Sequence, residues 1–123
     1  MEVLLDTNFI ISCLMKKIDF LGQLEEMGFK SVIPREVYQE LKDLRVSNKI
    51  SHEERVVIDV ALELFQKGKV KHTKLGRRSV DEGLILKGKS GIYIATLDRE
   101  IKRQIPNKIG ILSSAKRVQV ERD

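Results

Sequence analysis

The sequence predicts an α/β domain in which a mostly parallel sheet of about five strands lies between two layers of helices. Two observations predict this class. Short apolar or β-branched runs alternate with amphipathic helical stretches along the whole chain, and several helices begin at recognisable capping residues. Parallel strands need crossover connections, and helices supply them on both faces of a sheet. With 123 residues, the chain is expected to form one domain over residues 1–123.

The first half begins with a buried strand over residues 2–5 (EVLL), followed by an apolar helix over 9–15 (FIISCLM). Asp19 is a plausible cap for a second helix over 20–27 (FLGQLEEM), which Gly28 ends. A short strand over residues 30–33 follows. Pro34 then pre-sets the first turn of a helix that runs to Leu44.

The second half continues the alternation. Ser51 with Glu54, and Ser79 with Glu82, have the spacing of capping boxes that open helices. The expected elements are a helix over residues 53–66, a weak strand over 69–72, a helix over 79–86, a strand over 92–96, a short helix that starts at 98 and ends before 106, and further strands over 109–112 and 117–120.

The charge balance permits a polyanionic partner. The net charge is +5 and the pI is about 9.4. Residues 69–78 (KVKHTKLGRR) contain no acid, and a second basic group runs through Arg99, Lys102, Arg103 and Lys108. Few aromatic residues are present to stack on bases, so we expect these cations to contact phosphates. Solvated surface charge explains either stretch equally well.

Cysteine and apolar content indicate the compartment. The single cysteine, Cys13, excludes an internal disulfide and suits a reducing cytosol. Two histidines and one cysteine are too few for a zinc site of the usual kind. No apolar run approaches the roughly 20 residues that span a bilayer, and the start MEVLLD lacks the features of a secretory signal. We therefore expect a cytoplasmic protein without a membrane partner.

Acidic residues follow the predicted strands at the sheet edge where functional groups collect in such folds. Asp6 closes the first strand, Asp98 lies two residues past IYIAT, and Asp81 lies in the first turn of the helix opened by Ser79. Each also has a structural explanation. Asp6 and Asp98 can cap the following helices, and the helix dipole favours Asp81 where it lies. Glu82 is better explained as the partner of Ser79 in the capping box.

Glu40 is the most informative acid. On a helix at 100° per residue it lies at the margin of the apolar face formed by Val37, Leu41 and Leu44, whereas Glu36 is more ambiguous. A glutamate turned toward the core needs a partner, which is either a buried cation or a bound ion. Four carboxylates converging at one edge would repel one another unless a cation lay among them. All-oxygen ligands favour Mg²⁺ or Mn²⁺, which suits phosphodiester hydrolysis.

The segments VLLDTN, VIPREVYQEL, SVDEGLI and IYIATLDREIKRQI, taken in that order, resemble the four motifs of PIN-domain ribonucleases. The resemblance covers nearly the whole chain and implies a metal-dependent endoribonuclease. Within the family, the third motif and the segment from Ala95 to Ser114 look most similar to archaeal and eukaryotic proteins of rRNA processing. Toxins of the VapC type share the acidic quartet and are the alternative.

Carried over by position, the resemblance makes Asp6, Glu40, Asp81 and Asp98 the catalytic acids. Asp6, Asp81 and Asp98 are the expected ligands of Mg²⁺ or Mn²⁺, and Glu40 completes the site or orients the attacking water. Asn8 and Thr96 support it, and Glu82 could share or assume the role of Asp81. The RNA backbone is expected to contact the basic residues Lys69, Lys71, Lys74, Arg77, Arg78, Arg99, Lys102 and Arg103.

The partners implied are RNA, a second copy of the chain, and a ribosome-assembly protein or an antitoxin, according to the role. Two other functions remain open. One is a PIN-like module that binds RNA or protein without cleavage. The other is a phosphotransferase with a nucleophilic aspartate, but such enzymes need a second acid two residues after the first, where this chain has Asn8.

Overall fold

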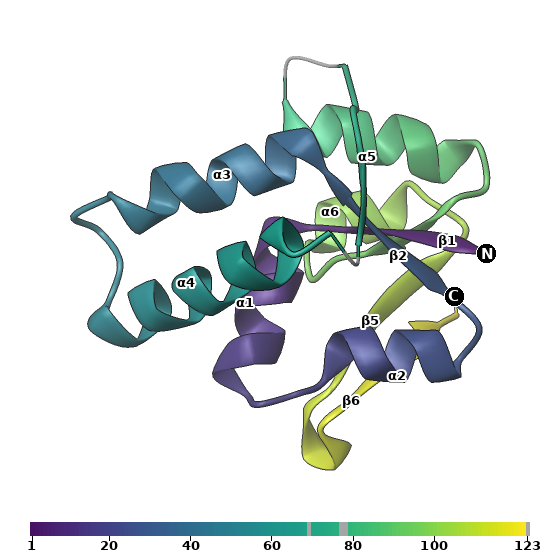
Figure 1. Ribbon diagram of the computed structural model, residues 1–123. Coiled ribbons are helices and arrows are strands. Elements are labelled where there is room, and N and C mark those ends of the chain that lie inside the picture. Colours follow the sequence, from purple (N-terminus) through teal and green to yellow (C-terminus); the bar gives the residue numbers. More distant parts are fainter. Residues whose placement is uncertain (69, 77–78, 123) are drawn as a thin grey trace.

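The structure is a computed structural model that describes residues 1–68, 70–76 and 79–122 (Figure 1). Its elements, in chain order, are β1 (Glu2–Leu5), α1 (Thr7–Met15), α2 (Phe20–Glu26), β2 (Lys30–Pro34), α3 (Arg35–Arg45), α4 (His52–Gln66), β3 (Lys71–Thr73), α5 (Val80–Lys89), β4 (Tyr93–Ala95), α6 (Arg99–Arg103), β5 (Lys108–Leu112), a 3₁₀ turn (Ser113–Ala115) and β6 (Arg117–Glu121). No helix in the described part of the chain is long and apolar enough to cross a membrane.

The strands form one sheet in the order β3-β2-β1-β4-β5-β6. β1 is central, and its Leu4 pairs in parallel with Val32 of β2 and Ile94 of β4. The outer pairs are also parallel, except that β6 runs antiparallel to β5. This confirms the predicted fold class. The sheet has six strands rather than about five, because residues 117–121 fold back along β5.

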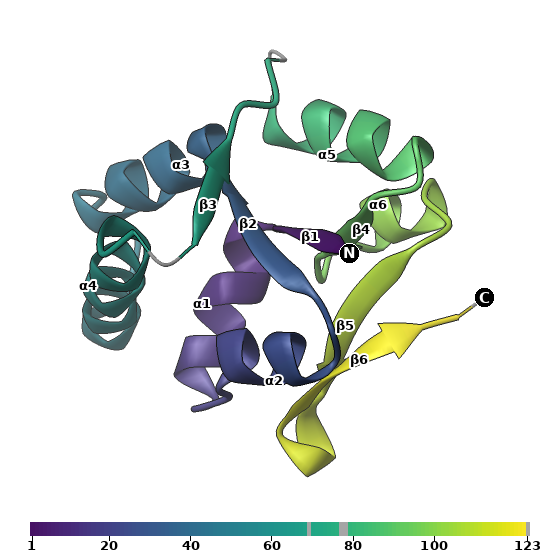
Figure 2. The same ribbon diagram turned by 45° about the vertical axis from the view of Figure 1, so that its right-hand side comes forward.

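Helices cover both faces of the sheet, and the two faces divide the core. Val3 and Leu5 of β1 pack into a cluster with apolar side chains of α1, α2, α3 and α4. Leu4, which points the other way, packs into a second cluster with side chains of α5 and α6. Figure 2 shows these two groups of helices on opposite sides of the sheet. Because β1 to β4 are parallel, their carboxyl ends all lie at the same edge of the sheet.

Most element boundaries follow from local residues. Asp19 accepts a hydrogen bond from the Gly22 N–H at 3.1 Å, and Gly28 has a φ of +89° just after α2. The Ser51–Glu54 capping box forms in both directions. Pro34 differs slightly from the expectation, because it is the last residue of β2 and the N-cap of α3 rather than part of its first turn. The weak strand begins at Lys71, two residues later than expected.

Helix α5 runs to Lys89 instead of ending near residue 86. The extension includes Gly88, whose small size allows close packing. This glycine is buried inside the helix, where a β-carbon would lie only 2.4 Å from Cγ2 of Ile105 and 3.1 Å from Cγ1 of Ile94. The missing side chain lets α5 approach β4 and the end of α6 closely. Tertiary packing thus offsets the low helix propensity of glycine.

We expect Gly88→Ala to lower the free energy of unfolding by about 1 kcal/mol. Overpacking costs about 1–3 kcal/mol, and the better helix propensity of alanine returns up to about 1 kcal/mol. Urea unfolding measures the change, with Lys89→Ala, at the exposed neighbouring position, as the control. A Gly88→Ala variant more stable than the wild type would contradict this packing argument.

Candidate active site

Asp6 lies at the edge where the central parallel strands end, and it is almost fully buried. Its carboxylate accepts hydrogen bonds from the Thr7 N–H at 2.8 Å and from the Thr96 hydroxyl at 2.7 Å. Asp6 is 5% exposed and Thr96 is 0% exposed. The Asp6 N–H also donates to the Ala95 carbonyl at 3.0 Å, which joins the ends of β1 and β4. The side chain is therefore held in one place by neighbours on two strands.

The electrostatics of Asp6 show that two other predicted acids lie near it. Burial raises the pKa of the Asp6 carboxyl above its usual value, while the hydrogen bonds from Thr96 and Thr7 oppose the rise. The negative charges of Asp81 and Glu40 raise it further. The charges of two other predicted acids, one on α3 and one on α5, thus act on the carboxylate that follows β1.

Glu40 is half-buried on α3, at the margin of the apolar face as the helical geometry predicts. The structural explanation for such a glutamate is an ion pair with a buried cation. Within residues 1–68, 70–76 and 79–122, no ion pair involves Glu40. The charge of Glu40 therefore acts on Asp6 without a paired cation from the described residues.

Asp98 acts as a helix cap, and it is also linked to Asp6. Its Oδ1 accepts hydrogen bonds from the Glu100 N–H at 2.8 Å and the Ile101 N–H at 3.3 Å, at the start of α6. The hydroxyl of Thr96, which donates to Asp6, accepts a hydrogen bond from the Asp98 N–H at 3.1 Å. One threonine therefore positions two of the predicted acids, through the carboxylate of the first and the backbone of the second.

Asp81 and Glu82 differ in their relation to Asp6 and to the start of α5. Both are exposed in the first turn of α5, but only Asp81 contributes to the raised pKa of Asp6. The Glu82 N–H donates to the Ser79 hydroxyl at 3.1 Å, which is the capping role expected from the sequence. Asn8 is exposed at the start of α1, and among the described residues its side chain forms no hydrogen bond.

The predicted RNA-binding residues that the structure describes lie on β3, on the segment after it and on α6. Lys69, Arg77 and Arg78 lie outside the described residues. Lys71 forms an ion pair at 2.9 Å with Glu2, near the opposite end of the sheet from Asp6. Lys74 is exposed on the segment after β3, near Glu36. Arg99, Lys102 and Arg103 lie together on α6, directly after Asp98.

Glu36 has a role that the sequence left ambiguous, because it holds the segment that follows β3. Its carboxylate accepts hydrogen bonds from the Leu75 N–H at 3.0 Å and from the Gly76 N–H at 3.0 Å. Desolvation acts to raise the pKa of Glu36, but these backbone hydrogen bonds together hold it below the usual value. Glu36 lies one turn before Glu40 on α3, and that spacing is the signal that could have placed both at this edge.

Gly83 completes this connection to α5. A β-carbon at Gly83 would lie 2.7 Å from Cβ of Leu75, so the glycine lets α5 pack directly against Leu75. No local pattern in the sequence explains a glycine two residues after Asp81. In the structure, Leu75 is held on one side by Glu36 and on the other by Gly83. This packing sets where α5 begins, and with it the position of Asp81.

The donor chemistry of the site fits a hard divalent cation. Its oxygens come from carboxylates, and the buried Asp6 is already repelled by two neighbouring acids. The hydroxyl of Thr7, next to Asp6 in sequence, is buried without a hydrogen-bond partner in the described structure. However, among the described residues no three His, Cys, Asp or Glu side chains stand as a ready-made metal site. The site therefore matches a divalent cation in its negative charge and in its oxygen donors.

We expect Glu36→Gln to destabilise the fold at neutral pH. Because the folded-state pKa of Glu36 is lowered, its ionised form stabilises the protein above the ordinary value of 4.5, and this stabilisation is lost as the pH falls through the lowered value. Thermal unfolding should show a lower Tm for the variant at pH 7 and convergence with the wild type at acidic pH. Glu26→Gln, an exposed change on α2, is the matched control.

We expect Asp6→Asn to change the pH dependence of the stability of the metal-free protein. Since the folded-state pKa of Asp6 is raised, ionisation costs stability as the pH rises through that value, and the neutral amide avoids this cost. The amide has one acceptor oxygen in place of two, so it loses one of the hydrogen bonds from the Thr7 N–H and the Thr96 hydroxyl. In the presence of EDTA the Tm of the variant relative to the wild type should therefore rise between low pH and pH 7–8. Asp43→Asn, exposed on α3, should show no such rise. A Tm difference that does not change with pH would contradict the electrostatic account.

Known proteins match this chain over nearly its full length. The sequence profile of a family described as "PIN like domain" matches residues 3–113. Ribonuclease VapC9 of Archaeoglobus fulgidus is 34% identical over 121 residues, covering 94% of this chain and 86% of that protein. A solved structure of the PIN domain endonuclease Utp24 superposes with a TM-score of 0.77, covering 99% of this chain and 92% of that one, at 22% identity. The resemblance found in the four motifs is thereby confirmed, and the chain belongs to the PIN-like domain family.

Proposed function

We propose that this protein is an endoribonuclease that hydrolyses RNA phosphodiester bonds and depends on Mg²⁺ or Mn²⁺. The observation that carries the proposal is the buried carboxylate of Asp6, which Thr96 and Thr7 hold by hydrogen bonds and which the charges of Glu40 and Asp81 repel. Such repulsion is costly in the free protein, and a cation with a phosphate ligand offsets it. The similarity to a protein named as a ribonuclease supports RNA as the substrate.

Each acid has a distinct part in this proposal. Asp6, Asp81 and Asp98 would hold the metal ion, and Glu40 would orient the attacking water. When bound, the ion offsets the phosphate charge and lowers the pKa of its water. Thr96 keeps Asp6 in place through its 2.7 Å hydrogen bond, and Asn8 is exposed where it can contact the scissile phosphate.

Two biological roles share this chemistry. The motif pattern favours rRNA processing, whereas the relative named Ribonuclease VapC9 favours a toxin-type ribonuclease. The two roles predict different protein partners, a ribosome-assembly protein in the first case and an antitoxin in the second. The RNA that is cleaved separates them, since the same acids serve in both.

We expect Asp6→Asn to reduce RNA cleavage in the presence of Mn²⁺ by at least about 100-fold, because groups that act on the reacting phosphate contribute on this scale. Cleavage of a structured RNA, followed by gel electrophoresis with Mn²⁺, Mg²⁺ or EDTA, measures the effect. Asp43→Asn makes the same chemical change at an exposed site and should leave the rate unchanged.

Equal cleavage by the wild type and Asp6→Asn would contradict the role of Asp6. If the wild type cleaves no structured RNA with either metal ion, the protein is better described as a PIN-like binding module. Chelation by EDTA should abolish wild-type cleavage, and activity that persists in EDTA would contradict the dependence on a divalent ion.

A further inference from the structure

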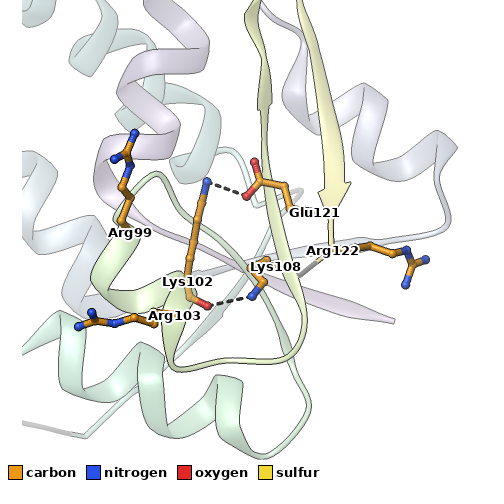
Figure 3. Close-up of a pocket in the computed structure, with 6 residues that line it drawn as sticks. All are labelled: Arg99, Lys102, Arg103, Lys108, Glu121 and Arg122. Carbon is orange, nitrogen blue, oxygen red and sulfur yellow. Dashed lines mark hydrogen bonds and ion pairs between the residues drawn. The ribbon is translucent and has the colours of Figure 1, made fainter.

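A second charged site lies at the corner where α6, the start of β5 and the end of β6 meet. It extends from Arg99, which follows Asp98, toward the amino ends of the parallel strands, since Lys108 pairs with Ile94 and Ile94 pairs with Leu4, two residues before Asp6. It is a pocket with a volume of about 250 Å³. Five of its six lining residues are basic, and all six are labelled in Figure 3: Arg99, Lys102, Arg103, Lys108, Glu121 and Arg122. The sequence grouped some of these cations but gave no sign that β6 completes a pocket with them.

Helix α6 supplies one wall of the pocket. Arg99, Lys102 and Arg103 are spaced by three and four residues, which places them on one side of the helix. Figure 3 shows Arg99 and Arg103 extending on the same side, with Lys102 reaching across toward β6. Arg99 directly follows Asp98, and the four-residue rise from Arg99 to Arg103 covers only about 6 Å. The basic wall therefore begins next to the proposed catalytic acids.

The strands supply the floor, which carries a buried positive charge. Lys108 and Glu121 are paired in register where β5 begins and β6 ends. Lys108 is 5% exposed, and its ammonium donates to the carbonyls of Lys102 at 3.0 Å and Ile105 at 3.1 Å. These hydrogen bonds hold the Lys108 ammonium against the C-terminal end of α6. Lys108 thus adds positive potential to the pocket from a fixed position.

Glu121 is the one acid in the pocket, and it occupies a place shaped for a carboxylate. It contacts Lys102 at 2.7 Å, in the least exposed of the ion pairs among the described residues, with the side chains 21% and 25% exposed. Its carboxylate lies over Gly110, where a β-carbon would come within 2.0 Å of Oε2. A small residue at this point of β5 therefore gives Glu121 room to reach Lys102.

Within the described residues, the arginines that line the pocket differ in whether an acid pairs with them. Arg103 also pairs with Glu100 outside the pocket, whereas Arg99 and Arg122 form no ion pair within the described residues. Like charges at close range repel, and an anion with several oxygens relieves that repulsion while accepting hydrogen bonds from guanidinium and ammonium groups.

We propose that this pocket binds a backbone phosphate of the RNA strand that reaches the acidic site, and that Lys102 exchanges Glu121 for that phosphate. The proposal deepens the proposed function, because it takes RNA to be the substrate. Glu121 then acts as an internal competitor that weakens binding to any single phosphate. A strand would pass from the acids along α6 to the end of β6.

The test measures binding of a fluorescent single-stranded RNA in EDTA, where cleavage does not interfere. Lys102→Gln and Arg99→Gln should each weaken binding about tenfold, and Lys102→Gln should reduce the slope of log K against log salt by about 0.7, the loss of one phosphate contact. Glu121→Gln should instead strengthen binding several-fold, because it removes the competing carboxylate.

The exposed Lys67–Glu63 pair on α4 provides matched controls. Lys67→Gln and Glu63→Gln make the same changes of charge away from the pocket and should leave both affinity and salt slope close to wild type. If the pocket variants behave like these controls, the proposal is wrong. Inorganic phosphate should not displace the RNA when its concentration equals that of the RNA's phosphate groups. If it does, the pocket binds a small anion and the proposal is also wrong.

The outcomes separate this proposal from the proposed function. RNA cleavage by the wild type together with control-like pocket variants would retain the nuclease and reject the pocket. The predicted pattern of binding without any cleavage would retain the pocket as an RNA-binding site and reject the nuclease.

Discussion

The hydrogen bond from the Thr96 hydroxyl to the Asp6 carboxylate connects most of what this structure arranges for function. It joins the ends of the two central strands, and both residues are buried there. The same hydroxyl accepts a hydrogen bond from the Asp98 N–H, so it also helps to position the start of α6. A buried carboxylate without such donors would be strongly destabilising. An acid can be buried at the end of the central strand because this threonine donates a hydrogen bond to its carboxylate.

Two acids near this edge have opposite electrostatic environments. The pKa of Asp6 is raised by burial and by the charges of Asp81 and Glu40, whereas the pKa of Glu36 is lowered by hydrogen bonds from backbone N–H groups. Glu36 therefore stabilises the fold at neutral pH, while ionised Asp6 costs stability. Strain concentrated at one acid and relieved at its neighbour is typical of functional sites.

Acidic and basic residues lie in adjacent groups in this molecule. Acids gather where β1 to β4 end, and basic residues begin at the very next position after Asp98. The net charge of +5 is thus concentrated in part beside the acidic site rather than spread evenly. In the proposed function, a polyanion would be attracted to the basic wall of α6, and the acids would receive its phosphate only together with a cation.

The sequence by itself determined the fold class, because strand and helix periodicity and capping residues are local signals, and the four acidic positions stay a prediction of its motifs. Short-range chemistry also fixed the caps at Asp19, Ser51 and Asp98. Only the tertiary structure decided that Asp81 rather than Glu82 acts on Asp6, that Glu36 holds Leu75 and Gly76, and that Glu121 meets Lys102. Gly83, Gly88 and Gly110 are explained only by the side chains that approach them. These relations join residues from different elements, so they depend on how strands and helices pack, which no local pattern encodes.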